Sequence, residues 1–128
     1  MNTITEKKGK KPENKGFVVN MPKWPRWQVE EFCGYVPKTT FWDDFWIGLL
    51  FGGIEGVCET YDRAFKEWRG DVVYVTELAM VLNHLGDFWW ERQRRVAEVF
   101  YDLYEQTDSW CREHLKGDDR EYYYRVTD

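Results

Sequence analysis

The stretch "TELAMVLNHLGDFWW", residues 76–90, decides the fold, because its apolar residues recur every three or four positions. That spacing places them on one face of an α-helix. The predicted buried stripe consists of Leu78, Val81, Leu82, Leu85, Phe88 and Trp89. Thr76 precedes this stripe and is a suitable N-cap. Gly86 costs about 1 kcal/mol relative to alanine inside a helix, so it indicates a close helix crossing or a local bend.

His84 and Asp87 are the residues of this stretch that could carry acid–base chemistry. They lie three positions apart, close enough on a helix for a hydrogen bond. Helical phase, however, puts them on the side away from the apolar stripe, together with Glu77. We therefore predict a solvated polar pair, with an interface role and a catalytic role as the weaker alternatives. Asn83, at the border of the stripe, is predicted to fix a helix crossing or to bond a neighbouring loop.

Two further long helices are predicted, at residues 54–70 and 94–116, each with one continuous apolar face. A shorter helix is predicted to start after the N-cap Thr40 and to end at Gly52 and Gly53. "DVVYV", residues 71–75, is the only β-like run, and a lone strand has nothing to pair with, so we predict a connector there.

Gly117 is predicted to end the last long helix, and a short final helix follows it. The predicted fold class is therefore all-α: a small helical domain of three main helices plus short flanking helices, orthogonal or bundle-like, with an extended N-terminal arm.

Composition divides the chain of 128 residues into three segments. Residues 1–16 are rich in Lys, Gly, Asn and Glu and are predicted to form a disordered basic tail. Residues 17–40 contain three prolines and are predicted to be an extended arm across the domain, with one short helical turn at 28–32. Trp24 and Trp27 of this arm are predicted to lie in surface grooves. Residues 41–128 form the predicted helical domain.

Charge is distributed unevenly along the chain. Residues 1–16 hold five Lys and two Glu, whereas residues 17–128 hold 13 basic and 21 acidic residues. An acidic body repels nucleic acid, so we expect no direct nucleic-acid binding by the body. No signal-peptide core follows the N-terminal lysines, and no apolar run is long enough for a membrane span. We expect a soluble cytoplasmic protein that does not bind membranes.

Motifs for a cofactor, a metal ion or a nucleophile are not found in the sequence. It has no C-x-x-C pair, no phosphate-binding glycine loop and no serine elbow. Cys33, Cys58 and Cys111 are widely spaced, which favours thiols in a reducing compartment. Cys58 lies on an apolar stripe and is predicted to be a small core residue. We expect no cofactor, no metal ion and no catalytic residue.

The best candidate interaction surface is the polar face of the helix at 94–116, where five acidic residues accompany one arginine. Aromatic residues make up 19% of the chain; most are predicted to fill the core, and several could instead be exposed as interface anchors. The residues that we assign to this surface are Glu98, Asp102, Glu105 and Asp108, with Trp90 and Tyr101 as its aromatic members.

Three phrases of residues 41–128 are distinctive in combination: "FWDDFWIGLLFGGIEGVCETYDRAFKEW", "YVTELAMVLNHLGDFWW" and "VFYDLYEQTDSW…HLKGDDREYYYRVTD". Together they resemble an uncharacterised family of short helical proteins from gut Bacteroidetes and their phages and mobile elements. The resemblance implies a small, phage-associated helical protein, and it brings no activity, cofactor or substrate.

These observations favour a small non-enzymatic interaction protein. We expect it to bind a host protein through the acidic and aromatic surface, for example as an inhibitor of a nucleic-acid-binding or defence enzyme. The alternative is a structural or self-associating protein with an aromatic interface. An enzyme that uses His84 and Asp87 is the weakest of the three hypotheses.

Overall fold

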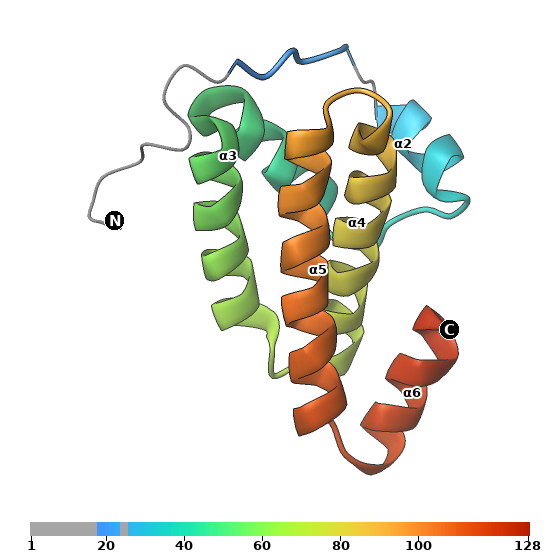
Figure 1. Cartoon of the computed structure of the whole chain (residues 1–128). Helices are drawn as coiled ribbons and strands as arrows, with labels where there is room; N and C mark the ends of the chain where they lie inside the picture. The colour runs from blue at the N-terminus through green and yellow to red at the C-terminus, as the bar shows by residue number, and fades with distance from the viewer. Residues whose placement is uncertain (1–17, 24–25) are drawn as a thin grey trace, which may run out of the picture.

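The computed structural model describes residues 18–23 and 26–128, and the side chains among them except those of 26–28. These residues form five α-helices and no strand: α2 (Arg26–Cys33), α3 (Phe41–Trp68), α4 (Val72–Trp90), α5 (Arg94–His114) and α6 (Gly117–Thr127). The predicted all-α fold class is confirmed (Figure 1). The predicted tail at 1–16 and the side chains of Trp24 and Trp27 lie outside the described residues.

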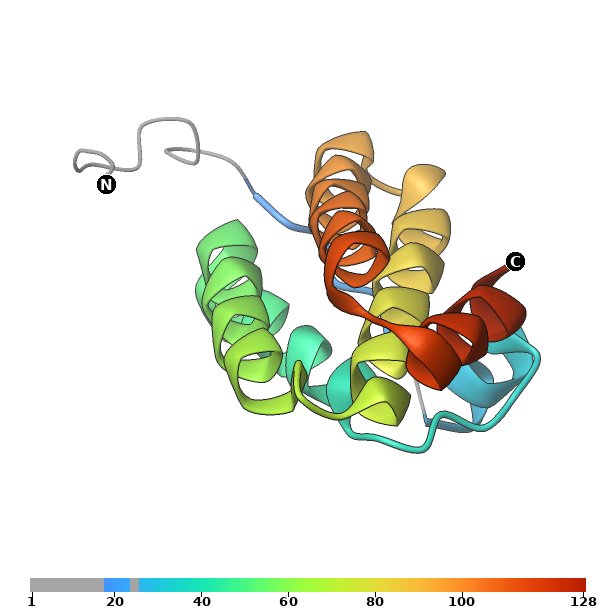
Figure 2. The ribbon, with the colours of Figure 1, turned by 90° about the horizontal axis from the view of Figure 1, so that it is seen from below.

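Helix α4 is the central element of the fold. It runs antiparallel to α5 along its length, and it also contacts α3 and α6 (Figures 1 and 2). Eleven of its 19 residues are buried, and all six residues of the predicted stripe are among them. Burial of these side chains at about 25 cal/mol per Å² of apolar surface is the main stabilising contribution available to a domain of this size.

A second, smaller core cluster attaches α6 to the other helices. It joins Val75 and Ala79 of α4 to Cys111, Leu115 and Tyr123. Of the three consecutive tyrosines in α6, Tyr123 is the buried one. Successive residues of a helix point about 100° apart, so only one of the three can face the core directly.

The start of α4 differs from the prediction. The helix begins at Val72, and its N-cap is Asp71, whose carboxylate accepts from the backbone N–H groups of Val73 and Tyr74 at 3.0 and 3.3 Å. Thr76 is buried inside the helix. The β-like run at 71–75 is thus helical, because a capping aspartate and the burial of Val75 outweigh a weak β preference.

Helix α3 consists of two limbs that meet at Gly53, as the predicted end at Gly52 and Gly53 implies. Gly53 has φ 62° and ψ −150°, a conformation open to glycine but strained for other residues. The kink brings Gly48 of the first limb onto Gly56 of the second. A Cβ built on Gly56 would lie 2.1 Å from the Gly48 carbonyl oxygen, so the two backbones are in direct contact.

Gly86 marks a close helix crossing, as predicted. A Cβ at this position would lie 2.4 Å from the ring of Tyr101 on α5. The missing side chain therefore leaves the space in which the Tyr101 ring lies against α4.

The N-terminal arm is extended only in part. Residues 18–23 have no regular secondary structure, and the side-chain amide of Gln93 fastens them. It accepts from the Asn20 N–H and donates to the Val18 carbonyl, both at 2.8 Å. The eight residues of α2, however, exceed the single turn predicted at 28–32. Val29 and Cys33, four residues apart, are both buried, so core contacts stabilise a second turn.

Replacing Gly56 by alanine should destabilise the protein, because the new methyl group would push the two limbs of α3 apart. We expect a loss of about 1–3 kcal/mol in the free energy of unfolding, the usual cost of overpacking, measured by urea denaturation. Gly52→Ala is the matched control, since a Cβ there meets nothing within 4 Å and the residue precedes the kink. Equal stability of the two variants would contradict the Gly48–Gly56 contact.

Candidate functional site

The side of α4 that was predicted to be solvated is largely covered, and that prediction is wrong for Glu77 and His84. Glu77 is only 7% exposed; its carboxylate accepts from the Tyr35 hydroxyl and the Lys38 N–H, both at 3.3 Å. His84 is half-buried, and its ring centroid lies 5.7 Å from that of Tyr35 and 6.4 Å from that of Phe32. The physical reason is that α2 and residues 34–40 pack over this side.

His84 and Asp87 contact different parts of the fold. Among the described residues no hydrogen bond joins the two side chains; Asp87 instead accepts from the hydroxyl of Tyr101. Burial lowers the pKa of His84, and the Asp87 charge only partly opposes that effect. Asp87 is exposed, as predicted. The two residues therefore do not form the pair that an acid–base site on α4 would need.

The acidic residues of α5 separate into two groups. Glu98, Asp102 and Glu105 are exposed. Asp108 is half-buried and accepts from the Tyr123 hydroxyl at 2.5 Å and the Arg112 Nε–H at 2.9 Å. Asp108 thus joins α5 to α6 and is not a free member of the predicted surface.

Trp90 and Tyr101 come together where α4 and α5 lie side by side. Their ring centroids are 6.0 Å apart with planes at 57°, and Trp90 is 40% exposed. The guanidinium of Arg94 lies 4.1 Å from the Trp90 ring centroid, a cation–π contact. Burial, with the Asp87 carboxylate, raises the pKa of Tyr101 to about 12, so its hydroxyl remains a hydrogen-bond donor at neutral pH.

Glu98 and Glu105 lie three residues before and four residues after Tyr101, and this spacing puts all three on one side of α5. The predicted surface is therefore partly assembled by the structure. We call Glu98, Asp102, Glu105, Trp90 and Tyr101 the acidic–aromatic surface.

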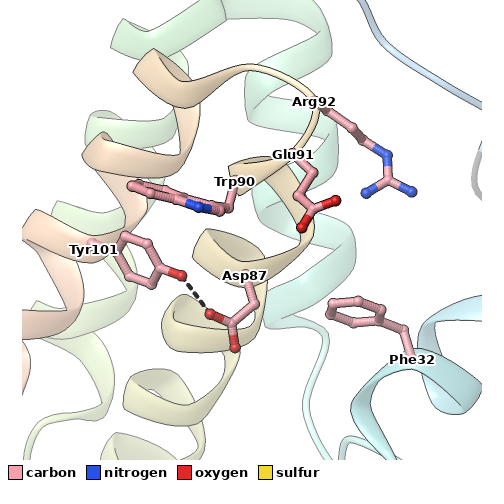
Figure 3. Close-up of a pocket in the computed structure, with 6 residues that line it drawn as sticks. All are labelled: Phe32, Asp87, Trp90, Glu91, Arg92 and Tyr101. Carbon is pink, nitrogen blue, oxygen red and sulfur yellow. Dashed lines mark hydrogen bonds between the residues drawn. The ribbon is translucent and has the colours of Figure 1, made fainter.

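An open hollow of about 530 Å³ lies beside this surface. Its walls come from α2, the end of α4, the turn after it and α5 (Figure 3). We call it the aromatic–acidic hollow; it is lined by Phe32, Asp87, Trp90, Glu91, Arg92 and Tyr101. The sequence pattern missed Phe32, because nothing in the arm indicated that α2 would pack against the end of α4.

A second exposed apolar feature was also missed. Ile47, Leu50 and Phe51 of the first limb of α3 are 53%, 51% and 82% exposed. Their spacing places them on one side of the helix, and we call them the outer stripe. The opposite side of the same limb is buried through Phe41, Phe45 and Leu49. Residues 45–54 carry no charge, so apolar side chains on more than one side of this limb could have been predicted from the sequence.

Metal ligands do not gather in the described part of the chain: no group of three or more His, Cys, Asp or Glu side chains there could hold an ion. Burial raises the pKa of the Cys58 thiol, which lowers its reactivity as a nucleophile at neutral pH. None of the described helices combines the length and apolar character needed to cross a membrane.

No protein-family model matches this chain. Comparison with curated proteins and with solved structures also finds no match. The family resemblance seen in the three sequence phrases therefore stays a prediction.

Replacing Glu77 by glutamine should change the pH dependence of stability. Burial raises the pKa of Glu77 in the folded state, so the folded protein loses stability as pH rises from about 4.5, the ordinary value, through the raised pKa. Glutamine carries no charge; its amide oxygen can accept from the Lys38 N–H, and its NH2 group can donate to the Tyr35 hydroxyl oxygen. We expect the stability of Glu77→Gln relative to wild type to increase across this window and then to level off.

Urea unfolding of both proteins between pH 4 and 8 measures this difference. The exposed residue Glu59 offers the control, since Glu59→Gln makes the same chemical change without burial. A constant difference between wild type and Glu77→Gln over the whole range would show that Glu77 is not buried in solution.

Proposed function

We propose that the protein acts by binding another protein through the acidic–aromatic surface. The observation that carries this proposal is Trp90, which stays 40% exposed while Arg94 and Tyr101 hold its ring. Exposed aromatic side chains with a fixed orientation are typical anchors of protein interfaces, since they bury a large area at a small entropic cost.

Charge indicates the kind of partner. Among the described residues no ion pair engages Glu98, Asp102 or Glu105, so their negative charges remain available to a partner. Such a surface complements a basic one, and the basic surfaces of nucleic-acid-binding proteins are of this kind. We infer that the target is a host nucleic-acid-binding or defence enzyme, which the protein blocks stoichiometrically in the cytoplasm. A phage or mobile-element origin of the protein rests on the family resemblance alone.

Binding is favoured over catalysis by the separation of His84 from Asp87. His84 packs against Tyr35 and Phe32, whereas Asp87 accepts a hydrogen bond from Tyr101. No catalytic role is therefore part of the proposal.

Reversing the three exposed charges of α5 should weaken capture of the partner. We expect the variant Glu98→Lys, Asp102→Lys, Glu105→Lys to bind the partner taken from a host lysate at least roughly tenfold more weakly, because like charges would then face each other. Asp108 is left unchanged, since its bonds to Tyr123 and Arg112 hold α6 in place. The measurement compares the dissociation constants of wild type and the variant for the purified partner at physiological salt.

The matched control reverses three exposed acids of α3, in the variant Glu59→Lys, Asp62→Lys, Glu67→Lys. It makes the same change in net charge on another helix. If both triple variants lose the partner equally, net charge and not the α5 surface determines binding; if neither loses it, the proposed surface is wrong.

Self-association is a second candidate function, and the outer stripe favours it. Ile47, Leu50 and Phe51 present three adjacent apolar side chains, and residues 45–54 carry no charge. Exposed apolar patches of this kind mark interaction sites. An uncharged patch suits pairing of two identical copies, because it adds no like-charge repulsion between them.

Phe51→Glu should weaken such pairing strongly. We expect a concentration-dependent dimer of the wild-type protein in sedimentation equilibrium, and a dimer at least roughly thirtyfold weaker in the variant. Val36→Glu is the control, because Val36 is also an exposed apolar residue but lies in the segment after α2. A wild-type protein that stays monomeric at all concentrations tested would eliminate this candidate.

A further inference from the structure

The aromatic–acidic hollow contains two carboxylates one helical turn apart. Asp87 projects from the last turn of α4 and Glu91 from the residue that follows α4, and both line the hollow between the ring of Phe32 and the rings of Trp90 and Tyr101 (Figure 3). The Tyr101 hydroxyl donates to one oxygen of Asp87, which fixes the direction of that carboxylate. Both carboxylates are exposed, and they line a space that is open to a partner.

The two nearest arginines contact aromatic rings, and one of them, Arg92, also lines the hollow. Arg92 lies over the Phe88 ring at 3.7 Å and donates to the Phe88 carbonyl. Arg94 lies over Trp90. In the part of the chain that the structure describes, no ion pair joins a basic side chain to Asp87 or Glu91. Among the described residues, the two negative charges of the hollow are therefore not neutralised by an ion pair, although Arg92 also lines the hollow.

Aromatic rings form both walls of the hollow. Phe32 is 40% exposed, and an edge-to-face contact with Phe88, with centroids 5.6 Å apart, orients its ring. On the other wall, Trp90 and Tyr101 are in contact with each other. The faces of aromatic rings attract cations, and the rings pack against the methylene groups of long basic side chains.

We propose that this hollow takes one arginine side chain of the protein partner. The stem would pack between Phe32 and the Trp90–Tyr101 pair, and the guanidinium would pair with Asp87 and Glu91. Arginine fits better than lysine, because its planar group stacks on aromatic rings and donates to two acceptors at once. The inference rests on the proposed function, and it adds the residue of the partner that the site recognises.

Titration of the full chain with N-acetyl-arginine amide tests the inference directly. The readout is the indole N–H signal of Trp90 in an NMR spectrum, assigned with Trp90→Phe. We expect this signal to shift with the arginine probe, less with N-acetyl-lysine amide, and not with N-acetyl-citrulline amide. Citrulline has nearly the shape of arginine without its charge, so it isolates the role of the two carboxylates.

The variant Asp87→Asn, Glu91→Gln should bind the arginine probe roughly fivefold to tenfold more weakly, the combined effect of two partly exposed charge contacts. Asparagine at 87 can still accept from Tyr101, so the site keeps its shape. The double variant Glu59→Gln, Glu113→Gln is the control for net charge, because it also removes two exposed carboxylates. Glu59 lies on α3, and Glu113 lies about 18 Å along the axis of α5 from Tyr101.

The inference is overturned if the probe does not shift the Trp90 signal at its highest soluble concentration, if citrulline shifts it equally, or if the double variant binds as wild type does. These results are separate from the test of the proposed function. If the α5 charge reversal weakens partner binding but the arginine probe does not bind, the acidic–aromatic surface remains the proposed interface. Only the proposed arginine site is then wrong.

Discussion

The close crossing of α4 and α5 at Gly86 is the contact on which the candidate site depends. Because Gly86 has no side chain, the Tyr101 ring can lie directly against α4. In that position its hydroxyl reaches Asp87, one residue further along α4, and its ring lies beside Trp90. A larger residue at 86 would displace the ring and separate these groups. One missing Cβ thus connects the packing of the core to the arrangement of the surface.

The second constraint is the covering of α4 by the arm and α2. Amphipathic spacing predicts a wet side that includes Glu77 and His84, but residues 34–40 and α2 bury that side. Buried polar groups need partners, and Glu77 obtains them from Tyr35 and Lys38. The same packing brings Phe32 to the hollow. The arm therefore contributes both to stability and to the surface that a partner would meet.

Sequence pattern predicted several features of the site for sound local reasons. Trp90 falls outside the apolar stripe of α4 and is exposed, and Glu98, Asp102 and Glu105 follow the polar side of α5. Tyr101 also falls outside its stripe, yet it is half-buried against α4. The sequence-based prediction was wrong where a side chain is bonded to a residue that is distant in the sequence. Asp108 looks like any acid of that polar side, yet it is bonded to Tyr123. The start of α4 was misplaced because Asp71, not Thr76, supplies the cap.

By itself, the sequence determined the all-α class and the apolar stripes of α4 and α5, and it indicated either a close helix crossing or a bend at Gly86. These depend on helical periodicity and on the size of single side chains, which are local properties. Only the tertiary structure decided which sides of those helices remain exposed. Exposure depends on what a distant segment covers: α2 and residues 34–40 cover Glu77 and His84, whereas nothing in the described chain covers Ile47, Leu50 and Phe51 to the same extent.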